Sequence, residues 1–428
     1  MIKIIDMLAP ARFPLQIVKL LVSAGDCEND VVAATRPGGP MSKILMVTWD
    51  GAGNFPPERA LVRGLLARGH SVHVLAHDTQ RSQVKDDGAE FEPLHGVFQW
   101  NSGDPFSEEP AFALDNVCMA KDFGSELLSA VDRLSPDLLL VDVMLLQALV
   151  AARQSGLPAV ALQHSVHSVL TGAFGAVFDT RLKEINDYAA ELGAGSFSSS
   201  QALIEGSQLV LVFSYRSFDP AETLAPNVVH VGPLRSRSKT TNAWSRRMPG
   251  RPLVVVSLST GYQDQAALLQ RLCDALGNLD VEALVTTGRA VAPDSLTASD
   301  NTAVVRFVAH EAVLSSADLL ICRAGHGSAI AGATFGVPML CFPMGRDQPM
   351  VADRVAQLGI GSVASPDATA LEIKRAIAKA LADPGLKRRA RQFADSVATH
   401  PGLDHAVALI ERLVSNSESG TRRPPELN

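Results

Sequence analysis

The turn formed by residues 323–328 contains the side chains whose types and spacing most clearly suggest chemistry. It reads Arg-Ala-Gly-His-Gly-Ser and follows an apolar segment at 319–322. Its glycines would let a ligand approach backbone N–H groups, and a helix that starts here would present such groups to an anion. Arg323, His326 and Ser328 add a positive charge, an imidazole and a hydroxyl at the same place. We therefore interpret the turn as a site for a diphosphate.

A second polar pair, Asp347 and Gln348, follows the next apolar segment, at 339–342. Parallel strands end at a common edge of their sheet, and ligands of α/β folds bind outside that edge. The simplest interpretation places a diphosphate on the 323–328 turn and a sugar on Asp347 and Gln348.

Apolar segments of strand length, separated by helical patterns, must position these groups. Continuous apolar strands that alternate with helices predict class α/β, with parallel sheets covered on both faces. The helix expected over 58–68 has apolar residues on one face and ends at Gly69. A stretch rich in proline and arginine, at 232–252, separates the two halves. The predicted strands are 44–48, 72–76, 138–141, 159–162 and 209–213 in the first half, and 253–257, 283–287, 304–308, 319–322 and 339–342 in the second.

Together, the turn, the Gly-Val-Pro sequence at 336–338 and the Asp-Gln-Pro sequence at 347–349 resemble the donor-binding signature of GT-B glycosyltransferases. The resemblance is closest to bacterial natural-product UDP/dTDP-glycosyltransferases of family GT1, the macrolide and antibiotic type. It covers residues 41–414 and is stronger in the second half. It implies two Rossmann-like domains that face each other across a cleft. It also implies a metal-independent, inverting transfer from a UDP- or dTDP-sugar to a hydroxyl of a lipophilic small molecule, with no further cofactor.

The resemblance also implies a division of the chain. We expect an acceptor-binding domain at 41–235, a linker at 236–252 and a nucleotide-sugar-binding domain at 253–402. A helix at 403–414 would cross back to the first domain, and the polar tail at 415–428 would be disordered. Because Met41 leads directly into the first strand, residues 1–40 are expected to be an N-terminal extension, either disordered or added by a start assigned too early. A short helix packed on the outside is the alternative.

On the donor side, Arg323 stands where the family usually has a histidine that contacts the diphosphate. A guanidinium can do this with two hydrogen bonds. Two departures concern the ribose and the sugar, because the family's ribose-binding glutamate falls on Ala331 and its frequent asparagine falls on Val351. The donor residues that the resemblance implies are Ser259, Thr260, Gly288, Val308, His310, Arg323, Gly325, His326, Gly327, Ser328, Asp347 and Gln348.

Such a reaction requires a base that takes the acceptor proton, and positive charge or N–H dipoles that stabilise the leaving diphosphate. The base is less evident from the sequence than the donor site. Relatives place a histidine after the first strand, where this chain has Asn54, whose neutral amide can orient a hydroxyl but cannot be a base. Asp142 matches the aspartate that supports that histidine, and here it would accept the proton directly. Its alternative role is to cap a helix. Asp50 is a second candidate, or a turn-forming residue.

The predicted acceptor-binding residues are Asn54, Trp100, His164 and His167. The two histidines follow the strand at 159–162 and are a third option for the base; the alternative is that they are solvated loop residues. Other aromatic side chains of the first half suit a flat, lipophilic acceptor such as a polyketide or a phenolic. The alternative is that these aromatic side chains form ordinary core. These are Phe98, Phe106, Phe112, Phe174 and Phe178.

Composition limits the remaining possibilities. A chain of 428 residues predicts two domains, and a net charge of −7 argues against a nucleic-acid partner. The five cysteines are scattered, which predicts reduced thiols. No apolar run reaches the roughly 18 residues that span a membrane. We expect a cytoplasmic enzyme without stable membrane insertion, and no prediction of its oligomeric state follows.

Three other functions remain open from the sequence. The Arg-Ala-Gly sequence at 323–325 also resembles the turn of MurG-like transferases, which use a lipid-linked acceptor, but we find no basic, apolar patch for membrane docking. A non-catalytic GT-B protein that binds nucleotide sugars or scaffolds another enzyme would explain Asn54, Ala331 and Val351. An epimerase of the same architecture would need several acid or base groups at the sugar, and the sequence does not identify them.

Overall fold

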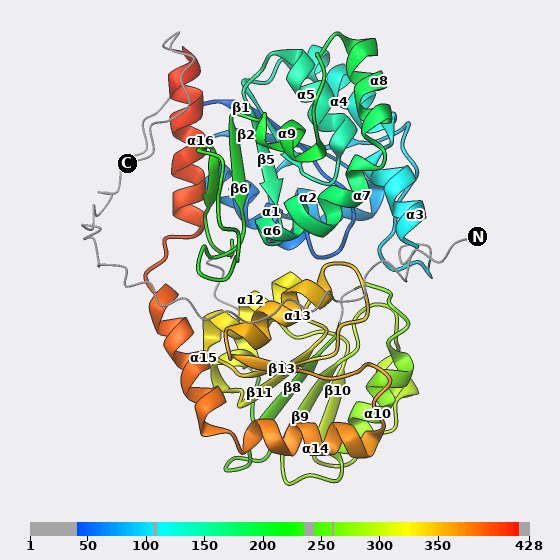
Figure 1. Ribbon diagram of the computed structural model, residues 1–428, viewed down its shortest axis with the longest axis vertical. Helices are drawn as coiled ribbons and strands as arrows, with labels where there is room; N and C mark the ends of the chain where they lie inside the picture. Colours follow the sequence, from blue (N-terminus) through cyan, green and yellow to red (C-terminus); the bar gives the residue numbers. More distant parts are fainter. Residues whose placement is uncertain (1–40, 106–108, 235–243, 259–260, 419–428) are drawn as a thin grey trace, which may run out of the picture. The chain divides into compact units, whose positions relative to one another are not determined.

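Two parallel β-sheets flanked by helices organise the chain (Figure 1). The computed structural model describes residues 41–105, 109–234, 244–258 and 261–418. Residues 39–428 form one structural unit, and both sheets lie within it. This is the predicted α/β architecture of two Rossmann-like domains.

The first sheet has seven strands in the order β3-β2-β1-β4-β5-β6-β7, and every neighbouring pair is parallel. All five residues of β4 are buried, as expected of a central strand covered on both faces. The strands are β1 (Lys43–Val47), β2 (Ser71–Ala76), β3 (Glu90–Pro93), β4 (Leu138–Asp142), β5 (Ala159–Gln163), β6 (Leu209–Val212) and β7 (Val228–His230).

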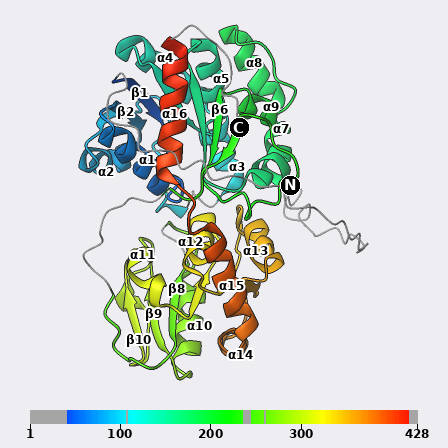
Figure 2. The same ribbon diagram turned by 90° about the vertical axis from the view of Figure 1, so that its left-hand side faces the viewer.

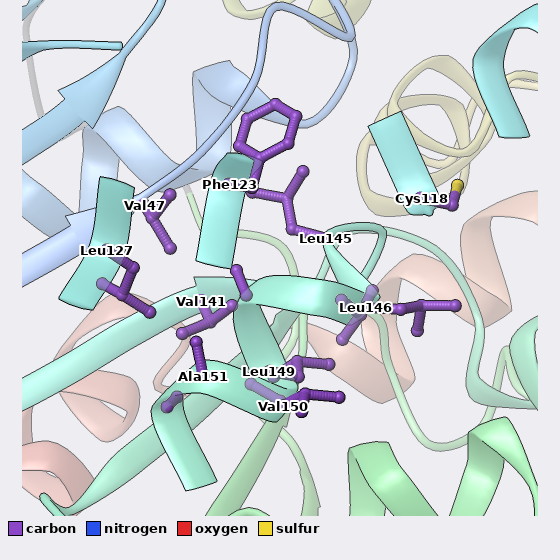
Figure 3. Close-up of a cluster of buried hydrophobic side chains, with 14 of the residues drawn as sticks. Val47, Cys118, Phe123, Leu127, Val141, Leu145, Leu146, Leu149, Val150 and Ala151 are labelled. Carbon is purple, nitrogen blue, oxygen red and sulfur yellow. The ribbon is translucent and has the colours of Figure 1, made fainter. Parts of the chain in front are cut away.

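Helices α4 and α5 cover one face of this sheet with apolar side chains. Figure 3 shows Phe123 and Leu127 of α4 and Leu149 of α5 grouped with Val47 and Val141 of the strands. The first half contains α1 (Phe55–Ala67), α2 (Arg81–Asp86), α3 (Pro110–Ala113), α4 (Lys121–Leu134), α5 (Leu146–Ser155), α6 (His167–Val169), α7 (Gly175–Asp179), α8 (Leu182–Leu192) and α9 (Ser200–Glu205), with the short turns η2 (Asp78–Gln80), η4 (Leu114–Cys118) and η5 (Leu170–Phe174).

The second sheet has six strands in the order β10-β9-β8-β11-β12-β13, again all parallel. Its strands are β8 (Leu253–Ser257), β9 (Glu282–Thr286), β10 (Thr302–Val305), β11 (Leu319–Cys322), β12 (Met339–Cys341) and β13 (Gly361–Val363). Its helical elements are α10 (Ala266–Leu276), η6 (Pro293–Ser295), α11 (His310–Val313), η7 (Leu314–Ser316), α12 (His326–Phe335), α13 (Gln348–Gln357), α14 (Ala370–Leu381) and α15 (Pro384–Val397).

Strand order reverses at one point in each sheet. In the first sheet β1 pairs with both β2 and β4, and in the second β8 pairs with both β9 and β11. Ligands of such folds bind beyond the carboxyl ends of the strands at this reversal. The loops after β1, β4, β8 and β11 are therefore the first places to look for a site.

The last helix, α16 (Leu403–Glu418), packs with the first sheet and its helices, although it follows the second sheet in sequence. Its apolar residues, including Ile410 and Leu413, join the core formed by β1, β6 and α1. Gly64 of α1 allows close approach, since an added Cβ would lie 3.0 Å from Leu403 and Val407. Figures 1 and 2 show α16 beside this sheet. The predicted return of the chain is thus observed.

The predicted strands are all present, with ends shifted by a few residues. Three strands were not predicted, namely β3, β7 and β13, and each is at an edge of its sheet. The predicted end of the last helix was also too early. Helix α16 continues to residue 418, and Ser415 Oγ donates to the Glu411 carbonyl 2.9 Å away.

Candidate functional site

Loops at the carboxyl ends of the strands carry unusual backbone geometry. Ala52 follows β1, Asp264 follows β8, Ala324 follows β11 and Arg346 follows β12, and their φ angles are +62°, +44°, +60° and +58°. Non-glycine residues adopt this left-handed region at a cost, and such strain gathers at functional sites. The described loops that bear the predicted site residues are therefore strained at four separate points.

Asn54 lies after β1 as an internal anchor. Its side chain is 1% exposed, and its Nδ2 lies 2.8 Å from Asp142 Oδ2, 3.0 Å from the Trp49 carbonyl and 3.3 Å from Thr48 Oγ1. Gly51 leaves the necessary room, because an added Cβ would lie 2.8 Å from Asn54 Oδ1. Asn54 thus holds the Asp142 carboxylate and does not present its amide to an acceptor, contrary to its predicted contact.

Asp142, the last residue of β4, is fully buried. One carboxylate oxygen accepts from the Met144 N–H at 2.8 Å, and the other accepts from Asn54. A group with no exposed surface and both oxygens engaged is not placed to receive a proton from an acceptor hydroxyl. The geometry therefore argues against the prediction that Asp142 acts directly as the base, and it suits a supporting carboxylate.

Glu58 on α1 completes this buried group, and the sequence reading missed it. It is 1% exposed and accepts from Thr48 Oγ1 at 2.5 Å. Burial, and then the negative charge of Asp142, raise the pKa of Glu58 well above its usual range. A carboxyl that retains its proton can share it with Asp142. The signal was available, since Glu58 stands on the same face of α1 as the buried Leu61 and Leu65.

His164 follows β5 and approaches the same carboxylate. Its Nδ1 lies 3.7 Å from Asp142 Oδ2. This nitrogen is buried and has no hydrogen-bond partner among the described residues, whereas the side chain as a whole is 25% exposed. The accessible surface therefore belongs to other atoms of the side chain. His164 therefore has one ring nitrogen near the buried carboxylate and other side-chain atoms exposed to solvent.

His167, three residues later, has a different environment. Its Nδ1 lies 3.0 Å from Gln163 Oε1 and its Nε2 lies 3.1 Å from Glu205 Oε1. Burial lowers the pKa of His167. With both ring nitrogens engaged and the side chain buried, His167 is not available for the predicted acceptor contact.

Asp50 and Trp100 also lie deeper than a binding surface requires. Asp50 is 5% exposed and accepts from Ser102 Oγ at 3.0 Å. Trp100 is 3% exposed, and its ring meets Trp49 edge to face at 5.5 Å. Among the described members of the predicted aromatic set around the acceptor, Phe98 is the exposed one, at 46%. Trp100 is thus part of the first core, which was the alternative to an acceptor contact, and Phe106 lies outside the described residues.

The 323–328 turn opens α12 as predicted, and it leaves free space. A Cβ added to Gly325 or Gly327 would meet no described atom within 4 Å. Gly327 is exposed, and Ser328 beside it is partly exposed. Burial lowers the pKa of His326 to about 3, so this imidazole is neutral. The turn therefore offers backbone N–H groups and space, and its charge must come from elsewhere.

Arg323, the first residue of the turn, carries a positive charge. It is 2% exposed, and its Nε donates to the Leu258 carbonyl at 3.2 Å. Leu258 immediately precedes Ser259 and Thr260, which are predicted donor residues and lie outside the described residues. The guanidinium thus supports the loop after β8 as well as the turn after β11.

Asp347 and Gln348 begin α13 in different environments. Asp347 is partly exposed and accepts from Ser165 Oγ at 2.8 Å. Gln348 is 3% exposed, and its Oε1 accepts from the Met344 N–H at 2.9 Å. Its Nε2 donates to Gln263 Oε1 at 3.0 Å. Of the predicted sugar-binding pair, Asp347 is the more accessible member.

The remaining donor residues line the ends of β8, β9 and β10. His310 Nε2 lies 3.1 Å from Ser257 Oγ, and the Gly288 N–H donates to the Arg306 carbonyl at 3.0 Å. Phe307, next to Val308, is 70% exposed. The loops that follow these three strands are therefore linked by hydrogen bonds.

At the two positions where the chain departs from the family pattern, Ala331 and Val351 are 5% and 0% exposed. They fill the core of the second domain.

No helix among the described residues combines the length and apolarity needed to cross a membrane.

Comparison with known proteins agrees with this geometry. Residues 270–413 match the family described as "Erythromycin biosynthesis protein CIII-like, C-terminal domain". The oleandomycin glycosyltransferase of Streptomyces antibioticus is 26% identical over 86% of this chain and 90% of its own length. The structure of CalG4, the calicheamicin glycosyltransferase, is 22% identical over 88% of this chain and 99% of its own, with a TM-score of 0.75. VinC, a glycosyltransferase in complex with dTDP, is 20% identical over 87% and 100%, with a TM-score of 0.66.

Proposed function

From the premise that this chain is a glycosyltransferase of the GT-B fold, similar to enzymes of antibiotic biosynthesis, we propose that it glycosylates a lipophilic small molecule. The donor would be a UDP- or dTDP-sugar, and the acceptor group a hydroxyl. The transfer would invert the configuration at the anomeric carbon. The observation that carries the proposal is the unfilled space over Gly325 and Gly327 at the start of α12.

The donor fits this space for electrostatic reasons. Backbone N–H groups at the start of a ten-residue helix attract an anion, and the glycines allow a diphosphate to approach them. Arg323 adds a buried positive charge, which acts more strongly than an exposed one. Both stabilise the negative charge that grows on the diphosphate as the sugar leaves. The partly exposed Asp347 would bind hydroxyl groups of the sugar.

A nucleotide panel tests the donor site. A ligand that binds only the native state raises its melting temperature, so UDP, dTDP, GDP and their common sugars should be compared by thermal shift. We expect a selective rise with UDP or dTDP species. Lack of a rise with every nucleotide would overturn the proposal.

A graded pair of variants makes this test specific. Gly327→Leu places a side chain in the open space, while Gly327→Ala adds only a methyl group. Neither meets a described atom within 4 Å at Cβ, so both should fold. The thermal shift should disappear in Gly327→Leu and largely survive in Gly327→Ala. An undiminished shift in Gly327→Leu would place the nucleotide elsewhere.

The chemical step then requires an acceptor screen. Wild-type protein with the nucleotide sugar that binds best should be incubated with macrolide, polyketide, flavonoid and simple phenolic acceptors. Release of the nucleoside diphosphate and the mass of the product report transfer, and NMR of the product reports its anomeric configuration. A product with retained configuration would contradict the inverting mechanism.

A further inference from the structure

We propose that His164 is the general base of this transferase and that Asp142 positions it. The inference rests on the proposed function and names a catalytic residue for it. Three observations carry it: the carboxylate beside Nδ1, the partial exposure of the side chain, and the contacts of residues 164 and 165 with the donor loops.

The position expected to hold the base cannot supply one. Asn54 occupies it, and its amide is committed to Asp142 and to the backbone of Trp49. Asp142 itself has no exposed surface. The chain therefore retains the supporting carboxylate but lacks a histidine in the loop after β1. A base must reach this carboxylate from another strand.

His164 does so from the end of β5. Its Nδ1 is buried, lacks a hydrogen-bond partner among the described residues and lies 3.7 Å from Asp142 Oδ2. A carboxylate at Nδ1 favours the tautomer that carries its proton there, which leaves the lone pair of Nε2 free to accept one. Hydrogen bonds of catalytic bases are often long before substrate binds and shorten in the complex.

The surroundings of His164 also place it beside the donor. The next residue, Ser165, donates to Asp347, the accessible member of the predicted sugar-binding pair. On the other side, the ring of His326 in the 323–328 turn is hydrogen-bonded to the backbone of His164. The charged or titratable groups facing His164 are thus Asp142 from β4 and His326 from α12. A base here stands between the supporting carboxylate and the sugar.

The step balances without another reactant. The acceptor oxygen forms a bond to the anomeric carbon while the bond from that carbon to the diphosphate oxygen breaks with its electron pair. The acceptor proton passes to His164 Nε2, and Asp142 stabilises the resulting imidazolium. The products are the glycoside, the nucleoside diphosphate and a proton later released to solvent. Asn54 and Glu58 act only by holding Asp142.

His164→Gln is the direct test, with His95→Gln as the matched control on an exposed loop. Loss of a general base should lower kcat by about 10²–10⁴-fold. The thermal shift caused by the nucleotide should be unchanged, because the diphosphate turn is intact. The limb of the pH profile that reports deprotonation of the base should also disappear. A variant that keeps wild-type kcat and the wild-type profile would overturn the assignment.

The acidity of the acceptor separates a base from a structural residue. An acidic phenol such as 4-nitrophenol ionises without help, so its transfer should suffer much less in His164→Gln than transfer to an aliphatic alcohol. Equal losses for both would indicate a structural role and contradict the proposal.

A measurement without acceptor keeps the inference independent of the proposed function. In ¹⁵N NMR of the wild-type protein, His164 should carry its proton on Nδ1 at neutral pH, and Asp142→Asn should remove that preference. An Nε2–H tautomer in the wild type would refute the proposed pairing. If the wild type glycosylates no acceptor and binds no nucleotide, the proposed function fails, and the tautomer still decides whether His164 and Asp142 are paired.

Discussion

At the end of β11 the chain leaves space for a ligand, whereas at the ends of β1 and β4 it fills the space with its own polar groups. Gly325 and Gly327 face no described atom that an added Cβ would reach, while Asn54, Glu58 and Asp142 are almost completely buried. The first region can bind an anion through backbone groups that a local sequence specifies. The second depends on side chains that meet only after folding. The comparison predicts that changes in the first region affect donor affinity, and that changes in the second affect turnover.

The largest effect should follow from Asp142→Asn. The amide cannot stabilise the imidazolium form of His164, so kcat should fall by about 10²–10⁴-fold while nucleotide affinity changes little. Steady-state kinetics and the nucleotide-induced thermal shift measure the two quantities. A variant with near-normal turnover would place the base elsewhere and would remove the contrast between the two regions.

Arg323→Ala should affect the region at the end of β11 and weaken nucleotide binding. It removes a buried charge and the hydrogen bond to the Leu258 carbonyl. Charge-assisted hydrogen bonds contribute about 1.5–3 kcal/mol, so nucleotide affinity should fall roughly 10- to 100-fold. Titration calorimetry with UDP or dTDP checks this. Arg323→Lys keeps the charge but not the planar fork and should be intermediate. Unchanged affinity in Arg323→Ala would remove this residue from the donor site.

Ser165→Ala tests the hydrogen bond that joins the two regions. A single neutral donor contributes about 1 kcal/mol, so the KM of the nucleotide sugar should rise several-fold, with kcat nearly constant. Affinity for the free nucleotide should not change, because Asp347 is expected to contact the sugar and not the nucleotide. An equal loss of affinity for the free nucleotide would mean that Ser165 supports the whole donor loop.

Glu58→Gln should have the smallest effect on turnover and a distinct effect on stability. Because burial and Asp142 raise the pKa of Glu58 in the folded state, the folded protein binds the proton more tightly than the unfolded chain. The stability from this proton is complete below the ordinary carboxyl pKa and declines as the pH rises towards the raised value. Glutamine mimics the protonated form, so the variant should gain stability relative to wild type as pH increases. Urea unfolding at a series of pH values measures the difference. A difference independent of pH would show that Glu58 is not protonated in the folded protein.

Most of the fold was predictable from apolar segments, because a central parallel strand is buried on both faces and its sequence shows this directly. β4 is an example, with all five residues buried. Three of the four edge strands, β3, β7 and β13, were not predicted in this way. β3 contains two glutamates and a proline, and two of the three residues of β13 are exposed. An edge strand pairs on one side only, so its residues need not be apolar.

In the candidate site, the residues that sequence alone could propose are close neighbours in the chain. Residues 323–328 and Asp347 could be recognised because a turn between a strand and a helix needs its glycines at fixed spacing. His164 and His167 are the contrary case. They are three residues apart and equally plausible from sequence. One has a buried Nδ1 near Asp142 with no hydrogen-bond partner in the part of the chain that the structure describes, and the other has both nitrogens engaged.

The sequence alone therefore determined the α/β class, the parallel sheets and the place of the turn at 323–328, because each follows from local periodicity and spacing. Tertiary structure decided what Asp142 faces. The contact between Asn54 and Asp142 spans 88 positions of the chain, and Glu58 reaches the same carboxylate from α1. Burial and long-range contact set the protonation state and availability of each group, and neither can be read from residue type and spacing.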